Sequence, residues 1–260
     1  MLLVTGLFVF FSRCISFRPA SLVHSLGRVR RIITERASQF SDETFLLRKN
    51  VELYSSLSIN NSLLNIPSIR EFGAMTKPEV LSPAGGWPQL IAACSNGADA
   101  VYFGLQEGFN ARVRASNFGI DDIEKVMIYL HDRGVKGYVV VNILVFDEEM
   151  MKLEPLIRRL ASAGVDALIM QDIGAVDLVR KIAPNLPVHG STQMSITDSH
   201  GADFATQKLG IDRVVVGREL SIKEINAIAL KSEAEVEAFV HGALCVSYSG
   251  QCFSSEAWGT

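Results

Sequence analysis

Cysteine is scarce in this sequence, and its four cysteines are spread along 260 residues, at positions 14, 94, 245 and 252. So few and so scattered cysteines exclude a small secreted domain held together by disulfides, and a reducing compartment is expected. Long hydrophobic runs are lacking as well. The apolar stretch at residues 2–11 is far too short to cross a bilayer, so no transmembrane segment is predicted.

An excess of positive charge is also lacking over most of the chain. Residues 77–260 hold sixteen Lys and Arg against twenty-three Asp and Glu, whereas residues 1–76 hold nine against five. An acidic body argues against tight non-specific binding to nucleic acid, which depends on many contacts between basic side chains and phosphates. A specific or transient contact with RNA stays open. With 48% hydrophobic residues, the chain can bury one sizeable core.

The first forty residues have a composition typical of an organelle transit peptide, with six arginines, five serines and a single acid, Glu35. A secretory signal is the alternative, because residues 2–11 are apolar, but no basic residue precedes them. We expect a chloroplast in preference to a mitochondrion, with a cytoplasmic location as the alternative. Residues 41–76 have weak periodicity and are interpreted as a linker, which leaves residues 77–260 as the folded domain.

From Pro78 onward, short runs rich in Val, Ile and Leu alternate with amphipathic segments of helical period, the pattern of βα units in a parallel sheet. Seven strands are predicted, at residues 79–82, 100–103, 137–142, 167–171, 187–189, 213–216 and 236–241. Helices are predicted at residues 87–95, 120–133, 148–163, 175–183, 201–208 and 221–230. Glycines follow four of these helices, as expected of C-terminal caps, at positions 97, 134, 164 and 210.

Both an open doubly wound sheet and a barrel are compatible with this periodicity. The first predicted strand leads into Ser82-Pro83-Ala84-Gly85-Gly86 and lacks the G-x-G-x-x-G fingerprint of dinucleotide-binding open sheets. We therefore predict an α/β fold of the (β/α) TIM-like barrel type. The domain has 184 residues, whereas a full barrel typically has about 250, so an eighth strand is expected to be missing. The first and seventh strands should then leave a gap with unpaired edges.

Polar residues follow the predicted strands at the end where a barrel builds its catalytic site, so we expect them to face one mouth. The candidates for catalysis are Asp172, His189, Gln193, Arg218, Glu219 and His241. A histidine can transfer protons near neutral pH, but it can equally bond a loop carbonyl. The candidates for substrate binding are Arg112, Arg114 and Asn142. An arginine suits a carboxylate or phosphate through bidentate bonds, and a salt bridge to an acid is its alternative role.

The predicted seventh strand leads into His241-Gly242-Ala243-Leu244-Cys245, which is followed by Tyr248-Ser249-Gly250-Gln251-Cys252-Phe253-Ser254. This stretch closely resembles the signature of peptidase family U32, the collagenase-like proteases. The resemblance extends back over the whole predicted barrel, through Leu81-Ser82-Pro83-Ala84-Gly85, Gly97-Ala98-Asp99-Ala100-Val101-Tyr102, residues 112–118, Val140-Val141-Asn142 and Arg218-Glu219-Leu220-Ser221.

Bacterial relatives in that family support hydroxylation of tRNA, ribosomal RNA or ubiquinone precursors, and four cysteines bind a four-iron four-sulfur cluster in them. The resemblance implies that Cys245 and Cys252 match the first two of these ligands. The other two would follow after Thr260, so a truncated, inactive product is one interpretation of the sequence. The resemblance also implies site roles for Arg112 and Arg218, because some relatives use the dicarboxylate prephenate as a hydroxyl source.

The residues alone leave the role of the two cysteines open. Their Cys-x6-Cys spacing is not the Cys-x2-Cys spacing of a structural zinc site, and free cysteines are often small buried hydrophobes. Thiolates do suit iron–sulfur clusters, which commonly take four of them. Together with the resemblance, this predicts Cys245 and Cys252 as the ligands of the cluster and its metal. Cys94, on an apolar helix face, and Cys14, in the leader, are not predicted ligands.

Two classes of enzyme compete on these observations. A peptidase needs an activated nucleophile or a metal-bound water, but the sequence has no H-E-x-x-H and no G-x-S-x-G motif. Ser191 is not in a nucleophile elbow, whereas Cys245 near His241 can be a thiol dyad. Because Cys245 is better explained as a cluster ligand, iron–sulfur-dependent hydroxylation of RNA ranks first. A collagenase-like peptidase ranks second.

Overall fold

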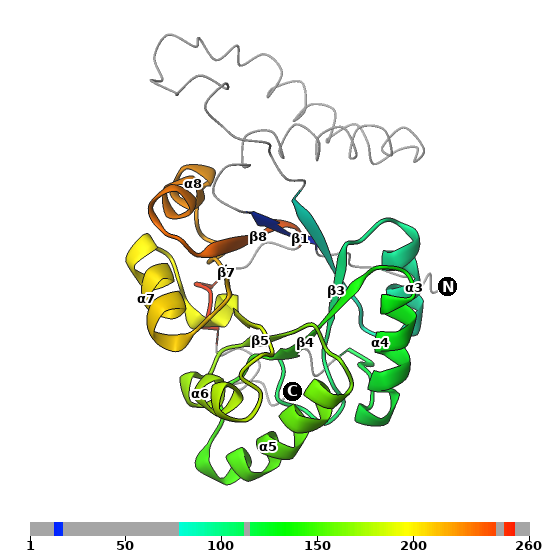
Figure 1. Ribbon diagram of the computed structural model, residues 1–260. Helices are drawn as coiled ribbons and strands as arrows, with labels where there is room; N and C mark the ends of the chain where they lie inside the picture. The colour runs from blue at the N-terminus through cyan, green and yellow to red at the C-terminus, as the bar shows by residue number, and fades with distance from the viewer. Residues whose placement is uncertain (1–12, 18–77, 112–114, 243–246, 253–260) are drawn as a thin grey trace, which may run out of the picture. The chain divides into compact units, whose positions relative to one another are not determined.

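The computed structural model describes residues 13–17, 78–111, 115–242 and 247–252. Its core is a ring of strands surrounded by helices (Figure 1). The seven parallel strands are β2 (Glu79–Pro83), β3 (Ala100–Phe103), β4 (Lys136–Val141), β5 (Ala167–Met170), β6 (Val188–Gly190), β7 (Arg213–Val215) and β8 (Glu235–His241). All seven predicted strands are present in the predicted order, which confirms the (β/α) barrel class.

Helices follow the parallel strands along the chain and form the outer layer of the ring (Figure 1). They are α3 (Trp87–Ser95), α4 (Ile123–His131), α5 (Asp147–Ser162), α6 (Ile173–Ile182), α7 (Ser199–Leu209) and α8 (Ile222–Lys231), with the short 3-10 helices η2 (Ile120–Asp122) and η3 (Thr192–Met194). None of the helices in the described part of the chain combines the length and the apolar character needed to cross a membrane.

One more strand closes the ring, and it comes from the predicted leader. Strand β1 (Arg13–Phe17) pairs antiparallel with β2 on one side and with β8 on the other. Within the described residues seven strands are parallel, and the predicted gap with two unpaired edges is wrong, because β1 pairs with both edges. β1 closes the ring through pairing with β2 and β8, which the composition of the predicted leader did not indicate. The rest of the predicted leader and linker lies outside the described residues.

Two apolar layers hold the domain together. The larger lies between the sheet and the helices, and includes Val101 and Phe103 of β3, both fully buried. The smaller fills the ring with inward-facing residues such as Leu81, Tyr102 and Tyr138. Residues 101 and 103 thus point outward while 102 points inward, because successive side chains on a strand alternate between its faces. This alternation brings polar side chains in the strands into the ring.

Close packing between a strand and a helix explains one glycine in the sheet. A Cβ atom at Gly137 in β4 would lie 2.6 Å from Sδ of Met127 and 2.8 Å from Leu130 of α4. Both distances are shorter than a real carbon contact. Glycine thus lets the side chains of Met127 and Leu130 in α4 pack directly on the backbone of β4.

Candidate functional site

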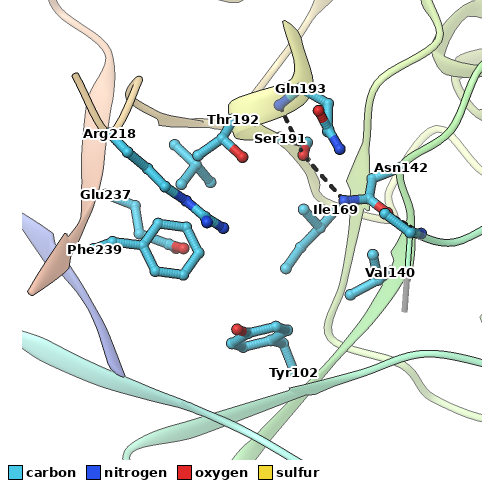
Figure 2. A pocket seen from close by; sticks show the side chains of 12 residues that line it. Tyr102, Val140, Asn142, Ile169, Ser191, Thr192, Gln193, Arg218, Glu237 and Phe239 are labelled. Carbon is cyan, nitrogen blue, oxygen red and sulfur yellow. Dashed lines mark hydrogen bonds between the residues drawn. The ribbon is translucent and has the colours of Figure 1, made fainter. Parts of the chain in front are cut away.

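A cavity of about 160 Å³ opens among the strand ends of the barrel, where (β/α) barrels place their reacting groups. Its side walls are apolar and aromatic, and its polar groups come from the loops that follow the strands and from Glu237 within β8 (Figure 2). The lining residues are Tyr102, Ala111, Val140, Asn142, Ile169, Ser191, Thr192, Gln193, Val215, Arg218, Glu237 and Phe239. Three residues predicted from the sequence are among them, namely Asn142, Gln193 and Arg218.

Asn142 joins three loops at one wall of the cavity. It directly follows β4, and its Oδ1 accepts a hydrogen bond of 3.0 Å from the backbone amide of Ala111, in the loop after β3. Its Nδ2 donates to Oγ of Ser191, at 3.3 Å, in the loop after β6 (Figure 2). The backbone amide of Gln193 also donates to this Oγ, which thereby caps η3. The amide of Asn142 therefore has a fixed orientation before any ligand binds.

Arg218 supplies positive charge at the exposed rim of the cavity. Its guanidinium lies over the ring of Phe239, 4.2 Å from the ring centroid, in an arrangement that stabilises a cation. Its backbone amide donates to Oγ of Ser249, at 3.0 Å. Because both its backbone and its side chain are held, Arg218 is oriented to bind a carboxylate or a phosphate.

Glu219 follows Arg218 in the chain, but its carboxylate contacts Ser249. Its Oε2 accepts hydrogen bonds from Oγ of Ser249, at 2.9 Å, and from the amide of Ser249, at 3.3 Å. Burial alone would raise the pKa of Glu219, but hydrogen bonds from its own backbone and from Ser249 lower the pKa below its ordinary value. The carboxylate of Glu219 thus anchors another segment of the chain and does not line the cavity.

That anchored segment, residues 247–252, includes Cys252. Besides the contacts with Glu219, the carbonyl of Ser249 accepts a hydrogen bond of 2.7 Å from Oγ of Ser195. Gly250 has φ +80°, and a Cβ atom there would lie 2.4 Å from the carbonyl oxygen of Gln193. The segment is therefore packed tightly on the loops after β6 and β7. Cys252 follows this anchor directly and is exposed.

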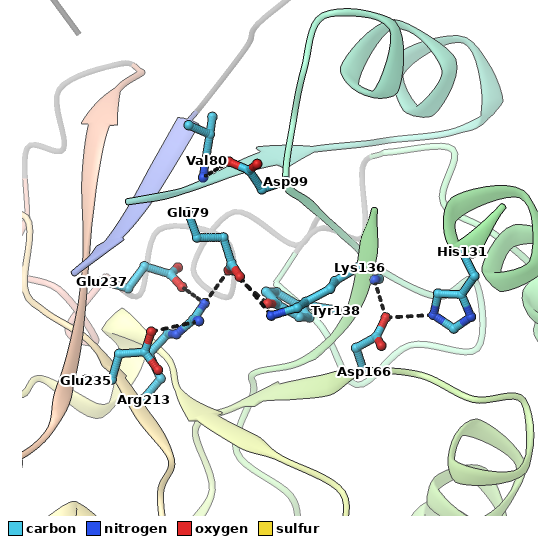
Figure 3. Close-up of polar contacts among 11 residues, drawn as sticks. Glu79, Val80, Asp99, His131, Lys136, Tyr138, Asp166, Arg213, Glu235 and Glu237 are labelled. Carbon is cyan, nitrogen blue, oxygen red and sulfur yellow. Dashed lines mark hydrogen bonds and ion pairs between the residues drawn. The ribbon is translucent and has the colours of Figure 1, made fainter. Parts of the chain in front are cut away.

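Sequence reasoning missed a largely buried group of charges that joins β2, β7 and β8 (Figure 3). Arg213 of β7 donates from Nη1 to Glu79, at 2.7 Å, and to Glu237, at 3.3 Å, and from Nη2 to Glu235, at 3.0 Å. Glu237 is 1% exposed and lines the cavity. The only sign in the sequence was the alternation of charged and apolar residues inside strands, as in Glu235-Val236-Glu237.

The ion pairs shift the ionisation of this group. Burial by itself would raise the pKa of Glu79, but its bond to Arg213, helped by Tyr138 and Lys136, lowers the pKa to about 2. Tyr138 donates its hydroxyl proton to Glu79, at 2.8 Å, and burial raises the pKa of Tyr138 far above its ordinary value. At neutral pH, Glu79 is therefore charged and Tyr138 is protonated.

His189, a predicted catalytic residue, lies inside the ring and not among the residues that line the cavity. It is 5% exposed, and its ring makes an edge-to-face contact with Tyr138 at 4.8 Å. Burial, reinforced by the charge of Arg213, lowers the pKa of His189 to about 3. Its Nδ1 atom has no hydrogen-bond partner within the described part of the chain. The imidazole is thus neutral at physiological pH.

The other predicted site residues are dispersed. Asp172 caps α6, where its side chain accepts from the amides of Ala175, at 2.8 Å, and Val145, at 3.3 Å. His241 ends β8, is exposed and does not line the cavity. The predictions for Arg112, Arg114 and Cys245 fall outside the described residues. Within the ranges that are described, no group of three or more His, Cys, Asp or Glu is placed to hold a metal.

Comparisons with known proteins agree with the resemblance noted in the sequence. A family model described as Peptidase family U32 matches residues 85–260. A tRNA hydroxylation protein P1 of Bacillus subtilis is 40% identical over 179 residues, which cover 69% of this chain and 42% of that protein. A 23S rRNA 5-hydroxycytidine C2501 synthase of Escherichia coli is 41% identical, over 69% of this chain and 26% of that protein.

A third relative has a name from another class of enzyme. A collagenase of Porphyromonas gingivalis is 34% identical over 189 residues, which cover 68% of this chain and 44% of that protein. The chain thus spans less than half the length of each of these three relatives.

Proposed function

This chain belongs to peptidase family U32, and from that premise we propose that it is the barrel part of an iron–sulfur protein that hydroxylates tRNA or ribosomal RNA. One observation carries the proposal. The cavity lined by Asn142, Gln193 and Arg218 lies beside an anchored segment that contains a predicted cluster ligand, Cys252. A substrate site and a redox centre would then share one mouth of the barrel. Two relatives are named for RNA hydroxylation.

We propose Cys245 and Cys252 as two ligands of a four-iron four-sulfur cluster. Cys252 fits this role because its side chain is exposed while the segment before it is fixed at Ser249 and Gly250. Four thiolates are the usual ligand set, so two further ligands are required beyond these two cysteines. Such a cluster supplies one-electron transfer when it is bound.

The cavity residues bind and orient the substrate in this proposal. Arg218 holds an anionic group through bidentate hydrogen bonds, and its contact with Phe239 limits its motion. The amides of Asn142 and Gln193 offer donors and acceptors along the opposite wall. Arg112 and Arg114 are proposed as further anion contacts, and prephenate is proposed as the hydroxyl source, with a carboxylate at Arg218.

A collagenase-like peptidase is the second candidate, because one relative is named a collagenase. The hydrogen bonds of Ser191 favour a peptidase less than a hydroxylase. Oγ of Ser191 is bonded to Asn142 and to the amide of Gln193, and no hydrogen bond joins a serine hydroxyl to a histidine ring in the part of the chain that the structure describes. A thiol dyad of Cys245 and His241 stays a prediction.

The test uses the chain extended by the downstream part that its relatives possess, purified without oxygen. We expect a brown protein with iron and sulfide in equal amounts, and loss of both in Cys245→Ser and Cys252→Ser, because a hydroxyl is a poor ligand for iron in a cluster. Cys94→Ser is the matched control, since Cys94 lies in α3 and is not a predicted ligand. It should keep its iron.

The RNA activity is tested in cells that lack the gene. We expect tRNA or ribosomal RNA from these cells to lose a hydroxylated nucleotide, measured by mass spectrometry of nucleosides. A cluster-free extended protein that cleaves gelatin, with cleavage lost in Cys245→Ser and unchanged RNA in the cells, would falsify this ranking and favour the peptidase. We also propose an organelle location, chloroplast before mitochondrion, directed by residues 1–40, which a fluorescent fusion of those residues would test.

A further inference from the structure

Three large apolar side chains are exposed on two neighbouring loops at the mouth of the barrel. The backbone amide of Val145, in the loop after β4, donates to Oδ2 of Asp172, which caps α6, at 3.3 Å. Leu144 and Phe146 flank Val145 in the chain, and Ile173 follows Asp172. Their exposed fractions are 59%, 71% and 56%. Because one hydrogen bond joins the loops beside all three residues, they lie close together, and we call them the rim patch.

The rim patch is held in place and adjoins the cavity. The amide of Phe146 donates to Oε2 of Glu149 at 3.0 Å, so the first turn of α5 holds the end of the loop. The bond between Val145 and Asp172 holds the loop on its other side. Asn142, at the start of the same loop, lines the cavity. A partner bound to the rim patch therefore lies at the edge of the cavity.

The charge around the rim patch favours a protein surface over a nucleic acid. Residues 142–151 contain Asp147, Glu148 and Glu149 but no lysine or arginine, and the first two acids are exposed. Acidic side chains repel phosphates, whose binding depends on Lys and Arg. Exposed apolar side chains with polar residues around them mark sites of protein contact. A complementary partner presents apolar residues with lysine or arginine beside them.

The chain returns to this end of the barrel at residues 247–252. Ser249 is bonded to Ser195 and to Glu219, in the loops after β6 and β7. The loops that follow the strands all lie at one end of a (β/α) barrel, so this segment and the rim patch share that end. The chain spans less than half the length of its three named relatives, which therefore have a long further part.

We propose that the part of the extended protein that follows Thr260 folds back over the mouth of the barrel and binds the rim patch. The inference rests on the proposed function, in which that part supplies two further cluster ligands. Its contact surface is apolar, with basic side chains facing Asp147 and Glu148. A part linked to residues 247–252 reaches the rim patch at a higher effective concentration than a free protein. Bound there, it covers the cavity and excludes water from it.

Photo-crosslinking of the extended protein tests the inference. Phe146→benzoylphenylalanine places a photoreactive ring on the rim patch. Phe204→benzoylphenylalanine is the matched control, because Phe204 is 56% exposed on α7. We expect position 146 to crosslink to residues after Thr260 of the same molecule, identified by mass spectrometry, and position 204 to give no such product. Crosslinks from position 146 only to a second copy or to RNA, no crosslink at all, or equal crosslinks from both positions would overturn the inference.

Limited proteolysis gives a second measurement with a pair of leucines. Leu230 is 61% exposed in the last turn of α8, which lies at the opposite end of the barrel from the mouth. Leu144→Ser should speed cleavage after Thr260 in the extended protein by roughly fivefold, because a leucine is lost from the buried contact. Leu230→Ser should leave that rate unchanged. Equal rates in the two variants would contradict the contact.

The inference and the proposed function fail in different results. An extended protein that crosslinks from position 146 to its downstream part but binds no iron keeps the contact, and the cluster of the proposed function is then wrong. An extended protein that binds iron through Cys245 and Cys252 but gives no such crosslink keeps the cluster and overturns the inference. Iron binding together with the crosslink supports both.

Discussion

Nη1 of Arg213 and Oε1 of Glu79 lie 2.7 Å apart, although 134 residues separate the two positions in the sequence. The pair joins β7 to β2, two strands that are not neighbours in the ring, so the contact crosses the interior of the barrel. Glu237, which lines the cavity, bonds the same guanidinium. The position of Glu237 in the cavity is therefore coupled to a contact between β7 and β2 across the ring.

The first prediction concerns the contribution of this arginine to stability. Arg213→Met removes the cation that Glu79, Glu235 and Glu237 share, and we expect the free energy of unfolding in urea to fall by about 3–5 kcal/mol. Arg158→Met is the control, because Arg158 and Glu154 form an exposed pair on α5 and should contribute less than about 1 kcal/mol. Equal losses in the two variants would contradict the prediction.

The second prediction concerns acid stability between pH 6.5 and 4.5. The pKa of His189 falls from 6.5 to about 3 on folding, chiefly through burial, so the unfolded chain binds a proton in this window and the folded protein does not. Stability should therefore decrease as the pH falls through 6.5, by up to about 1.4 kcal/mol per pH unit. His189→Gln should reduce this slope in urea titrations. An unchanged slope would show that His189 does not cause the loss of stability in this pH window.

The third prediction concerns a lower pH window. The pKa of Glu79 falls from 4.5 to about 2 on folding, because Arg213 outweighs the opposing effect of burial. The carboxylate thus stabilises the fold above pH 4.5, by on the order of 3 kcal/mol, and this contribution is lost as the pH falls from 4.5 toward 2. Glu79→Gln should be less stable than the unmodified protein at pH 7, with the difference shrinking at pH 3. A difference that does not change with pH would point to packing alone.

How far the sequence predicts this molecule can be judged from particular elements. Helix α3 has the predicted bounds, because its apolar spacing and its proline in the first turn are local signals. Strand β1 was missed, since closing the ring depends on backbone pairing with β2 and β8 and not on composition. Long-range pairing of this kind leaves no periodic signal in the chain.

The residues of the candidate site also divide into those with a local signal in the sequence and those that depend on long-range contacts. Asn142, Gln193 and Arg218 were predicted because they follow strands, and position after a strand is a local property. Glu237 was missed because it lies within a strand, and only the closed ring shows that this side chain faces inward. His189 lies inside the ring, as its position in a strand implies. Its surroundings there come from other strands, through Tyr138 and Arg213.

The last prediction concerns the anchor of the cysteine segment. Gly250→Ala places a Cβ atom 2.4 Å from the carbonyl oxygen of Gln193, in backbone with φ +80° that alanine adopts poorly. Gly97→Ala is the matched control, because Gly97 has φ +79° and nothing lies within 4 Å of its added Cβ atom. The backbone cost is therefore similar at the two sites, and only Gly250→Ala has to displace residues 247–252.

We expect Gly250→Ala alone to speed proteolysis in that segment and to lower the iron content of the extended protein. Both variants should lose similar global stability, about 1 kcal/mol, since a side chain is strained at positive φ. Equal iron contents and equal rates of cleavage would show that the packing of Gly250 on Gln193 does not position Cys252.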